Sequence, residues 1–188
     1  MTRLMYDSVD AAKIPSGAEM VAGYANGRYI WSTADWNKFP HATHVNIDVS
    51  GVMPGADVLD VESGDATPAG AVRWIQARKA KGISEVGVLY VNRSNITAVY
   101  NAMAGAGLKV VHDFKVWIAT LDGTKTVHDM TGVVAVQYEN TPGWDASVVY
   151  DDTWKATVSA PEVLRGVLVQ LPGGAARAVT SHDGKTWA

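Results

Sequence analysis

The sequence predicts an α/β fold: an irregular, TIM-like (β/α) barrel with missing helices, followed by a small C-terminal β-hairpin or meander. Eight short apolar runs have the length and composition of buried strands, and helical patterns separate some of them. After Trp154 the pattern changes to short alternating runs. A length of 188 residues suits one substantial domain with a short appendage.

The expected strands are short runs of apolar, β-branched and aromatic residues bounded by turn residues. They are Leu4–Asp7, Met20–Ala25, His44–Val49, Val58–Glu62, Val86–Val91, Lys109–Val111, Val116–Leu121 and Val133–Tyr138. Strands that alternate with helices favour a parallel sheet, and eight of them suggest that the sheet closes. Only Ser50–Asp57 separates the third strand from the fourth, which is too short for a crossover helix. We therefore expect several connections to be loops.

Three helices are predicted from their caps and periodicity. One begins after Thr67, a natural N-cap that precedes Pro68, and ends near Gly82. A second begins near Asn95 and ends at the glycines at positions 105 and 107. A shorter helix begins at Ser32, because an aspartate three residues later gives the spacing of a capping box.

The chain divides into an expected barrel, residues 1–155, and a linker with a β appendage, residues 156–188. The linker surrounds Pro161, and the runs Val167–Leu171 and Ala176–Ser181 flank a Pro-Gly-Gly turn, which is typical of a hairpin. A unit of this size is not stable alone. It must therefore pack on the barrel, on a partner chain or within a larger assembly.

Composition excludes several classes of function. A net charge of −3 and a pI of about 5.9 give no reason to expect nucleic acid or an anionic membrane as a partner. The amino terminus lacks the apolar core of a signal peptide, and no apolar run is long enough for membrane insertion. Seven Trp and seven Tyr against two Phe suit sugar or interface recognition, or equally the amphipathic edge of a core.

Polar side chains gather at the carboxyl ends of the expected strands, which in a barrel meet at one mouth, the usual place of the active site. Each one alone would be read as a solvated loop edge, but at least five strands end this way. These polar positions are Asp7, Asn46, Asp48, Asp60, Glu62, Tyr90, Asn92 and Gln137. We therefore expect a common site at that mouth.

Asp60 and Glu62 are the most informative pair. Carboxylates two residues apart on a strand lie roughly 6 to 7 Å apart at the backbone, so the charge of one raises the proton affinity of the other. One acid and one carboxylate are what glycoside hydrolysis needs. The alternative is structural: an Asp before a loop and a surface Glu.

A divalent cation held by Asp57, Asp60, Glu62 and Asp65 is the second alternative, but the spacing does not match an EF-hand loop. The five histidines show no ligand spacing, and neither a nucleophile elbow nor a phosphate-binding glycine loop is present. We expect neither a metal nor a cofactor.

The polar motifs occur in a familiar order: Tyr6-Asp7-Ser8, Asp60-Val61-Glu62, Tyr90-Val91-Asn92, Trp117-Ile118-Ala119, Val136-Gln137-Tyr138 and Trp144-Asp145-Ala146-Ser147. Over about residues 3 to 154 the chain resembles the family 25 glycoside hydrolases, which are lysozymes. It is more similar still to the glycoside-hydrolase-like barrel domains of high-GC Gram-positive bacteria and their phages. The resemblance implies an eight-stranded barrel with fewer than eight helices.

The resemblance also implies cleavage of the β-1,4 bond between N-acetylmuramic acid and N-acetylglucosamine in peptidoglycan. It assigns Glu62 as general acid and Asp60 as its partner, which holds the acetamido group or the developing charge. Asp7 and Asp145 are the remaining acids of the site. The expected substrate contacts are Tyr24, Asp48, Tyr90, Asn92, Trp117 and Gln137.

Three features depart from the family pattern. The last strand has Val136 where the family has Trp, the Asp145 motif reads Asp-Ala-Ser instead of Asp-Leu-Asn, and the C-terminal hairpin has no counterpart in the catalytic core. We expect a phage-encoded muramidase that binds peptidoglycan glycan strands, either an endolysin kept in the host cytoplasm until lysis or a virion-associated enzyme. The alternative is an inactive glycan-binding or structural virion protein, with residues 156–188 as the virion or self-assembly contact.

Overall fold

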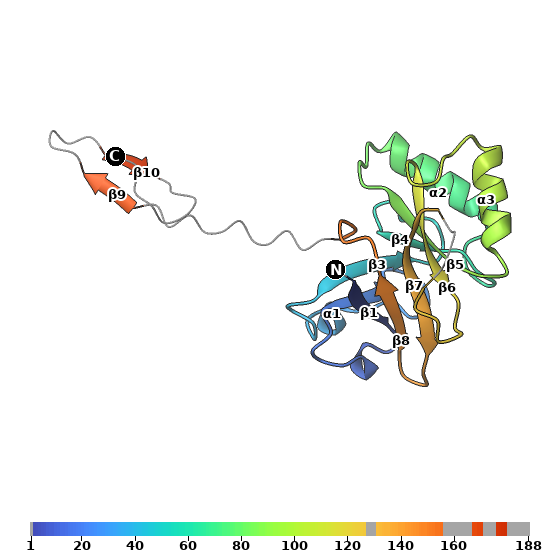
Figure 1. The fold of residues 1–188 in the computed structure, drawn as a ribbon, viewed down its shortest axis with the longest axis horizontal. Helices are drawn as coiled ribbons and strands as arrows, with labels where there is room; N and C mark the ends of the chain where they lie inside the picture. Colours follow the sequence, from blue (N-terminus) through green and yellow to red (C-terminus); the bar gives the residue numbers. More distant parts are fainter. Residues whose placement is uncertain (1, 127–130, 156–166, 171–175, 180–188) are drawn as a thin grey trace. The chain divides into compact units, whose positions relative to one another are not determined.

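A closed barrel of eight strands forms the first part of the protein (Figure 1). The computed structural model describes residues 2–126, 131–155, 167–170 and 176–179. The barrel strands are β1 (Arg3–Asp7), β2 (Met20–Tyr24), β3 (Thr43–Asp48), β4 (Val58–Asp60), β5 (Gly87–Asn92), β6 (Phe114–Ala119), β7 (Val133–Asn140) and β8 (Asp145–Val149). β1 to β7 pair in parallel, and β8 closes the ring by pairing antiparallel with both β7 and β1. The prediction of a closed eight-stranded barrel with few helices is confirmed.

One expected strand is absent from the structure, and one strand of the barrel was not among those expected. The prediction of a strand at Lys109–Val111 is wrong: this segment contributes only an isolated bridge between Val110 and Phe114. Val111 has a φ of 72°, which breaks the extended backbone that a strand requires. The eighth strand is instead β8. The sequence does not predict it as a strand, because its first residues are small or polar.

The predicted helices are confirmed as α1 (Thr33–Trp36), α2 (Pro68–Ala80) and α3 (Ile96–Gly105), and a short 3₁₀ helix, η1 (Ala11–Lys13), adds to them. The Thr67 hydroxyl accepts a hydrogen bond from the backbone N–H of Gly70 at 3.1 Å, as expected of an N-cap. Ser32 and Asp35 form both bonds of the capping box. α2 follows β4 and α3 follows β5 in the chain.

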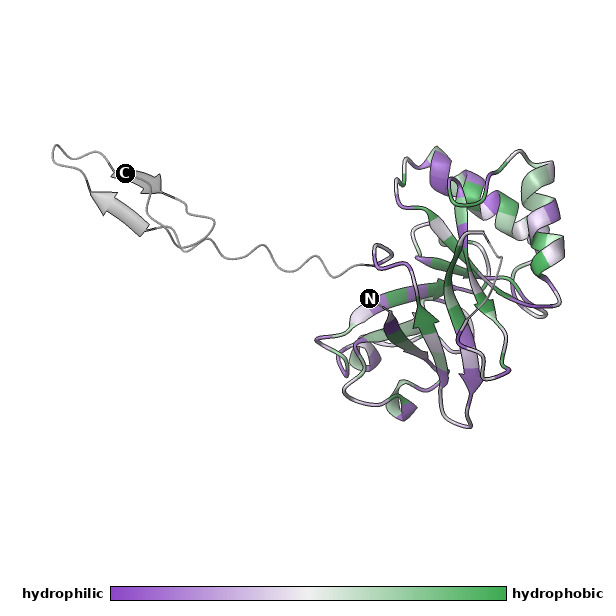
Figure 2. Cartoon of the chain, viewed as in Figure 1, coloured by the Kyte–Doolittle hydropathy of each residue, from purple (hydrophilic) through white to green (hydrophobic). Residues whose placement is uncertain are grey.

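The barrel has two apolar layers because alternate side chains of each strand face opposite ways. The inner layer fills the barrel and includes Met5, Met20, Val88 and Trp117. The outer layer lies between the strands and the helices α2 and α3; its members include Leu59, Leu89, Val136, Trp74 and Met103. Figure 2 accordingly colours many residues of the barrel strands as hydrophobic.

The chain separates into two compact units, Met1–Lys155 and Ala156–Ala188. In the second unit, β9 (Val167–Gln170) and β10 (Ala176–Val179) pair antiparallel, as the alternating runs predict. The linker, the Pro-Gly-Gly turn and residues 180–188 lie outside the described residues. None of the described helices has the length and apolar character that a membrane crossing requires.

Candidate active site

The parallel arrangement places the carboxyl ends of β1 to β7 at one end of the barrel, which we call the mouth. Asp7 ends β1 and Asp60 ends β4. Asp145 begins β8, and since β8 runs antiparallel, its first residue also lies at the mouth, directly opposite Asp7 in the register. The structure therefore brings together acids that are more than 130 residues apart in the chain.

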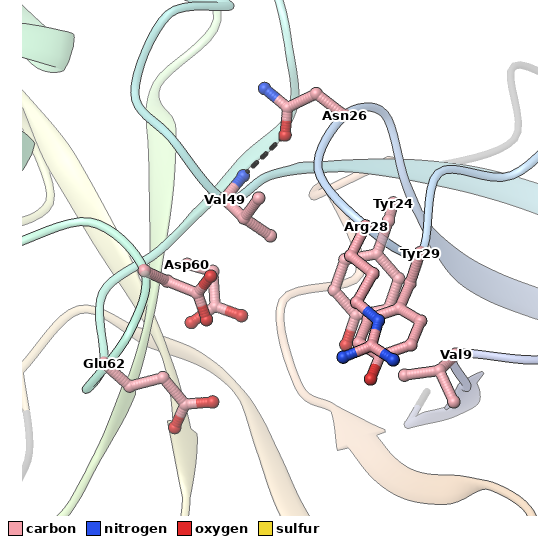
Figure 3. Close-up of a pocket in the computed structure, with 9 residues that line it drawn as sticks. Val9, Tyr24, Asn26, Arg28, Tyr29, Val49, Asp60 and Glu62 are labelled. Atoms are coloured by element: carbon pink, nitrogen blue, oxygen red, sulfur yellow. Dashed lines mark hydrogen bonds between the residues drawn. The ribbon is translucent and has the colours of Figure 1, made fainter.

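A cavity of about 270 Å³ opens at the mouth (Figure 3). Its acidic side is formed by Asp60, Glu62 and Asp65, while Arg28 and two tyrosines, Tyr24 and Tyr29, lie across from Asp60 and Glu62 in the close-up. The remaining lining residues are Val9, Asn26 and Val49. Of the predicted site residues, Tyr24, Asp60 and Glu62 line this pocket.

Asp60 and Glu62 differ in burial and position. Asp60 is 5% exposed, and its Oδ1 has no hydrogen-bond partner among the described residues. Burial, together with the charges of Glu62 and Asp65, raises the pKa of Asp60 to about 8. Glu62 is half-buried and lies just beyond the end of β4, not within the strand as predicted.

The pKa of Glu62 is also raised, chiefly by burial, although a hydrogen bond from Asn92 opposes the shift. In that bond Nδ2 of Asn92 donates to Oε2 of Glu62 at 3.4 Å. Oδ1 of Asn92 accepts from the backbone of Asn95 at the start of α3. Asn92 therefore positions Glu62 instead of presenting a free amide to a substrate.

Asp7 and Asp145 form a second pair of acids at the mouth, and neither is among the residues that line the cavity. Burial, followed by the charges of Asp145, Asp60 and Glu62, raises the pKa of Asp7 well above its usual value. Burial raises the pKa of Asp145 to about 6, against a hydrogen bond from Gln137. Four carboxyl groups at one mouth therefore hold protons with different affinities.

Tyr90, Gln137 and Trp117 lie beneath these acids. The Tyr90 hydroxyl donates to Oε1 of Gln137, which leaves the amide nitrogen of Gln137 for Asp145. Trp117 packs edge-on against Tyr90 at 4.8 Å and donates its Nε1–H to Ser147. Trp117 and Gln137, two of the expected substrate contacts, are 1% and 2% exposed; they lie inside the barrel and are not among the residues that line the cavity.

Tyr24 and Tyr90 remain neutral phenols. Burial first, and then the nearby carboxylates led by Asp7, raise the pKa of both hydroxyls. Tyr24 alone of the two lines the pocket, where it can present a ring face and a hydroxyl donor.

Asp48 does not contact the pocket. On β3 the apolar residues face the barrel interior, so Asp48 faces outward, and it is 0% exposed. Its carboxylate accepts hydrogen bonds from Nδ2 of Asn26 at 2.6 Å and from the backbone of Ser50, Gly51 and Met53. Burial alone would raise the pKa of Asp48, but these hydrogen bonds outweigh it and lower the pKa. The predicted substrate contact is thus corrected to an anchor for two loops.

The sequence analysis missed Arg28 and Tyr29. Both lie in the loop that follows β2, at the same barrel end as the predicted acids. The signal was available, because loops after the carboxyl ends of barrel strands build active sites. The predicted site residues belong to the expected strands, to their carboxyl ends or to the Asp145 motif, whereas Arg28 and Tyr29 lie in a loop.

The acids of the pocket also have the chemistry of a cation site. One carboxylate oxygen from each of Asp60, Glu62 and Asp65 lies within 4.8 Å of the others. Asp57, the fourth candidate, lies elsewhere: it pairs with Nζ of Lys155 at 2.8 Å and accepts from Asn46. Metal ligands must be deprotonated, and the charges of Glu62 and Asp65 contribute to the raised pKa of Asp60, so a proton and a cation would compete for this cluster.

Comparison with protein-family models, with curated proteins and with solved structures finds no match to this chain. The chemistry of the site must therefore be read from its own side chains. These are a pair of acids with raised pKa values, an arginine across the pocket, and two tyrosine rings. Such a set can transfer a proton to a bound polar ligand and hold that ligand by ring contacts and hydrogen bonds.

Proposed function

We propose that this chain is a peptidoglycan-directed glycoside hydrolase of the muramidase type, on an irregular TIM-like barrel similar to that of the family 25 glycoside hydrolases. One observation carries the proposal: Asp60 and Glu62 share a pocket at the barrel mouth, and both have raised pKa values. Raised proton affinity lets a carboxyl group act as an acid near neutral pH. Two tyrosines and a cavity open to the mouth suit a sugar.

In this mechanism Glu62 is the general acid, because it is the half-buried carboxyl on the pocket wall and Asn92 fixes its position. Glu62 gives its proton to the glycosidic oxygen, and the electron pair of the breaking bond between the anomeric carbon and that oxygen passes to the leaving sugar. Water then bonds to the anomeric carbon, and a carboxylate at the mouth takes the proton that water releases. The proton that Glu62 gives up is matched by the proton that water releases, so the net reaction is the hydrolysis of one glycosidic bond.

The other acids have supporting roles. A carboxyl group with a pKa of about 8 is mostly protonated at pH 7, so Asp60 donates a hydrogen bond to the acetamido carbonyl of the substrate. Asp145, with a pKa of about 6, is mostly ionised at that pH and stabilises positive charge that develops on the sugar. Asp7 completes the acidic set.

The test is loss of turbidity of purified bacterial cell walls. Glu62→Gln should abolish clearing, because glutamine keeps the shape but has no proton to give, and its melting temperature should stay unchanged or rise, since active-site carboxylates usually lower stability. Glu85→Gln, which changes an exposed glutamate ahead of β5, is the matched control. If the Glu62→Gln protein clears walls as fast as the wild type, this mechanism is excluded. If the substitution greatly lowers the melting temperature, Glu62 is a structural residue.

The second candidate is an inactive glycan-binding or structural virion protein. The observation in its favour is the separate unit Ala156–Ala188, since the barrel is already closed without it. In this case both the wild type and Glu62→Gln would leave walls intact yet sediment with walls or with phage particles. Sedimentation without clearing therefore selects this candidate.

A further inference from the structure

We infer that Arg28 is a specificity residue that selects sugars carrying a free carboxylate, so that the pocket prefers glycan whose lactyl groups have lost their stem peptide. This inference rests on the proposed function and specifies its substrate. In muramic acid the lactyl carboxyl is neutral while the peptide is amide-linked to it. An amide hydrolysis that removes the peptide therefore supplies the glycan that this subsite prefers.

The pocket is charged unevenly. Three acids form one side, and Arg28 is the only basic residue among the described residues that line it. Figure 3 shows Arg28 on the same side of the cavity as Tyr24 and Tyr29, across from Glu62. A ligand that fits this arrangement carries negative charge at the Arg28 side and a neutral, hydrogen-bonding body at the acidic side.

Arg28 is free to bind such a charge. Arg28 is exposed, and within the described part of the chain it forms no ion pair. It makes a cation–π contact with the ring of Tyr29, with 5.4 Å between the guanidinium carbon and the ring centroid. Stacking on a ring holds the guanidinium plane while leaving its N–H groups for a ligand. A guanidinium can bind both oxygens of a carboxylate at once.

The loop that carries Arg28 is held in a defined conformation. Gly27 has a φ of +81°, and a Cβ there would lie 2.6 Å from the side chain of Val49. Asn26 donates to the buried Asp48, and its Oδ1 accepts from the backbone N–H of Val49 at 2.9 Å. The outward-facing Asp48 therefore fixes the loop, and Arg28 is presented at the pocket in advance of binding.

The single cation of the pocket decides which anion is accepted. A phosphate dianion carries two negative charges, and Arg28 is the single basic group among the described lining residues that could offset them. A single carboxylate on a long ether arm can reach Arg28 while the neutral sugar ring lies near the acids. The two tyrosines supply the flat apolar surface that a sugar ring contacts.

The experiment measures binding by calorimetry in the full chain carrying Glu62→Gln, which stops turnover. Two tetrasaccharides of alternating N-acetylglucosamine and N-acetylmuramic acid serve as probes: one with free lactyl carboxylates, the other with lactyl carboxamides of the same shape. The carboxylate should bind about tenfold more tightly, the usual effect of one charge-assisted hydrogen-bond pair. Adding Arg28→Met should remove this ratio, and Arg28→Lys should restore part of it.

Arg73→Met is the matched control, since Arg73 is an exposed arginine of α2 outside the pocket lining; it should keep the tenfold ratio. A ratio near one with Arg28 present, or a preference that persists after Arg28→Met, would overturn the inference. Clearing of walls by the wild type tests the proposed function separately. An Arg28-dependent preference without clearing leaves the carboxylate specificity standing and removes the hydrolase, while clearing without an Arg28-dependent preference removes the inference alone.

Discussion

Asp48 and Asp60 end neighbouring strands of the barrel, and both are almost completely buried. Their pKa values nevertheless move in opposite directions. Hydrogen bonds from Asn26 and the backbone overcome burial and lower the pKa of Asp48, whereas no side-chain hydrogen bond offsets burial at Asp60. At the scale of single residues, the hydrogen-bond partners of a buried carboxyl group decide whether it is ionised or protonated near neutral pH.

Asp60→Asn should stabilise the protein at pH 8 and have little effect near pH 4. Above about pH 4 the unfolded chain releases this proton, but the folded chain keeps it until about pH 8, so the free energy of unfolding falls as pH rises through this window. Asparagine carries no such proton, and the gain at pH 8 should be on the order of a few kcal/mol. Urea unfolding at both pH values measures it; an equal difference at the two pH values would contradict the raised pKa.

At the scale of elements, β3 and its loops differ from the other strands of the mouth. The apolar side chains of β3 face the barrel interior, so Asp48 at its end faces outward and binds the surrounding loops. By contrast, β1, β4 and β8 carry acids that face the site. The same Asp48 carboxylate ties the loop after β2 to the loop after β3. The pocket wall with Arg28 thus depends on a residue outside the pocket.

Asp48→Asn should destabilise the protein at pH 7 by about 1–3 kcal/mol, because an amide group would face backbone N–H donors in a buried position. The folded pKa of Asp48 is lowered, so its contribution is present above the pKa of the unfolded chain and is lost as pH falls below it. The deficit relative to wild type should therefore shrink toward pH 3. Asp60→Asn also approaches wild type at low pH, but its effect at high pH has the opposite sign, a gain in stability. A deficit that grows at low pH would refute this assignment.

The elements with strong local signals were predictable, and those whose form depends on tertiary pairing were not. Thr67 and Ser32 cap helices by local bonds, so their sequence patterns are sufficient. Asp60 and Glu62 could be placed at a strand end, but the inward or outward direction of Asp48 depends on which face of β3 enters the barrel, and both faces of a barrel strand are buried. β8 has little apolar periodicity and becomes a strand only between β7 and β1.

At the scale of the whole barrel, the end away from the mouth is closed by the chain that follows β8. Trp154 is 8% exposed and belongs to the inner apolar layer. The Arg3 guanidinium donates to the carbonyls of Asp151, Trp154 and Lys155, and Lys155 pairs with Asp57 at the start of β4. This segment seals the interior beneath Trp117.

Trp154→Ala should lower the free energy of unfolding by about 3 kcal/mol or more, since removal of a large buried ring leaves a cavity in the inner layer. Trp36→Ala, at a half-buried tryptophan of α1, should have a smaller effect. Denaturant unfolding of both full-length variants gives the comparison. Similar losses for the two substitutions would mean that Trp154 does not fill the barrel.

The antiparallel direction of β8 brings the chain back to the amino-terminal end of β1. Arg3 and Lys155 touch through a hydrogen bond of 2.9 Å, at the opposite pole from the acids. A folding unit whose entrance and exit are adjacent can be spliced into a surface turn of another protein with little distortion of its host. Insertion of this barrel into a surface turn through Arg3 and Lys155 would place the junction at the end opposite the pocket, so the pocket would stay open.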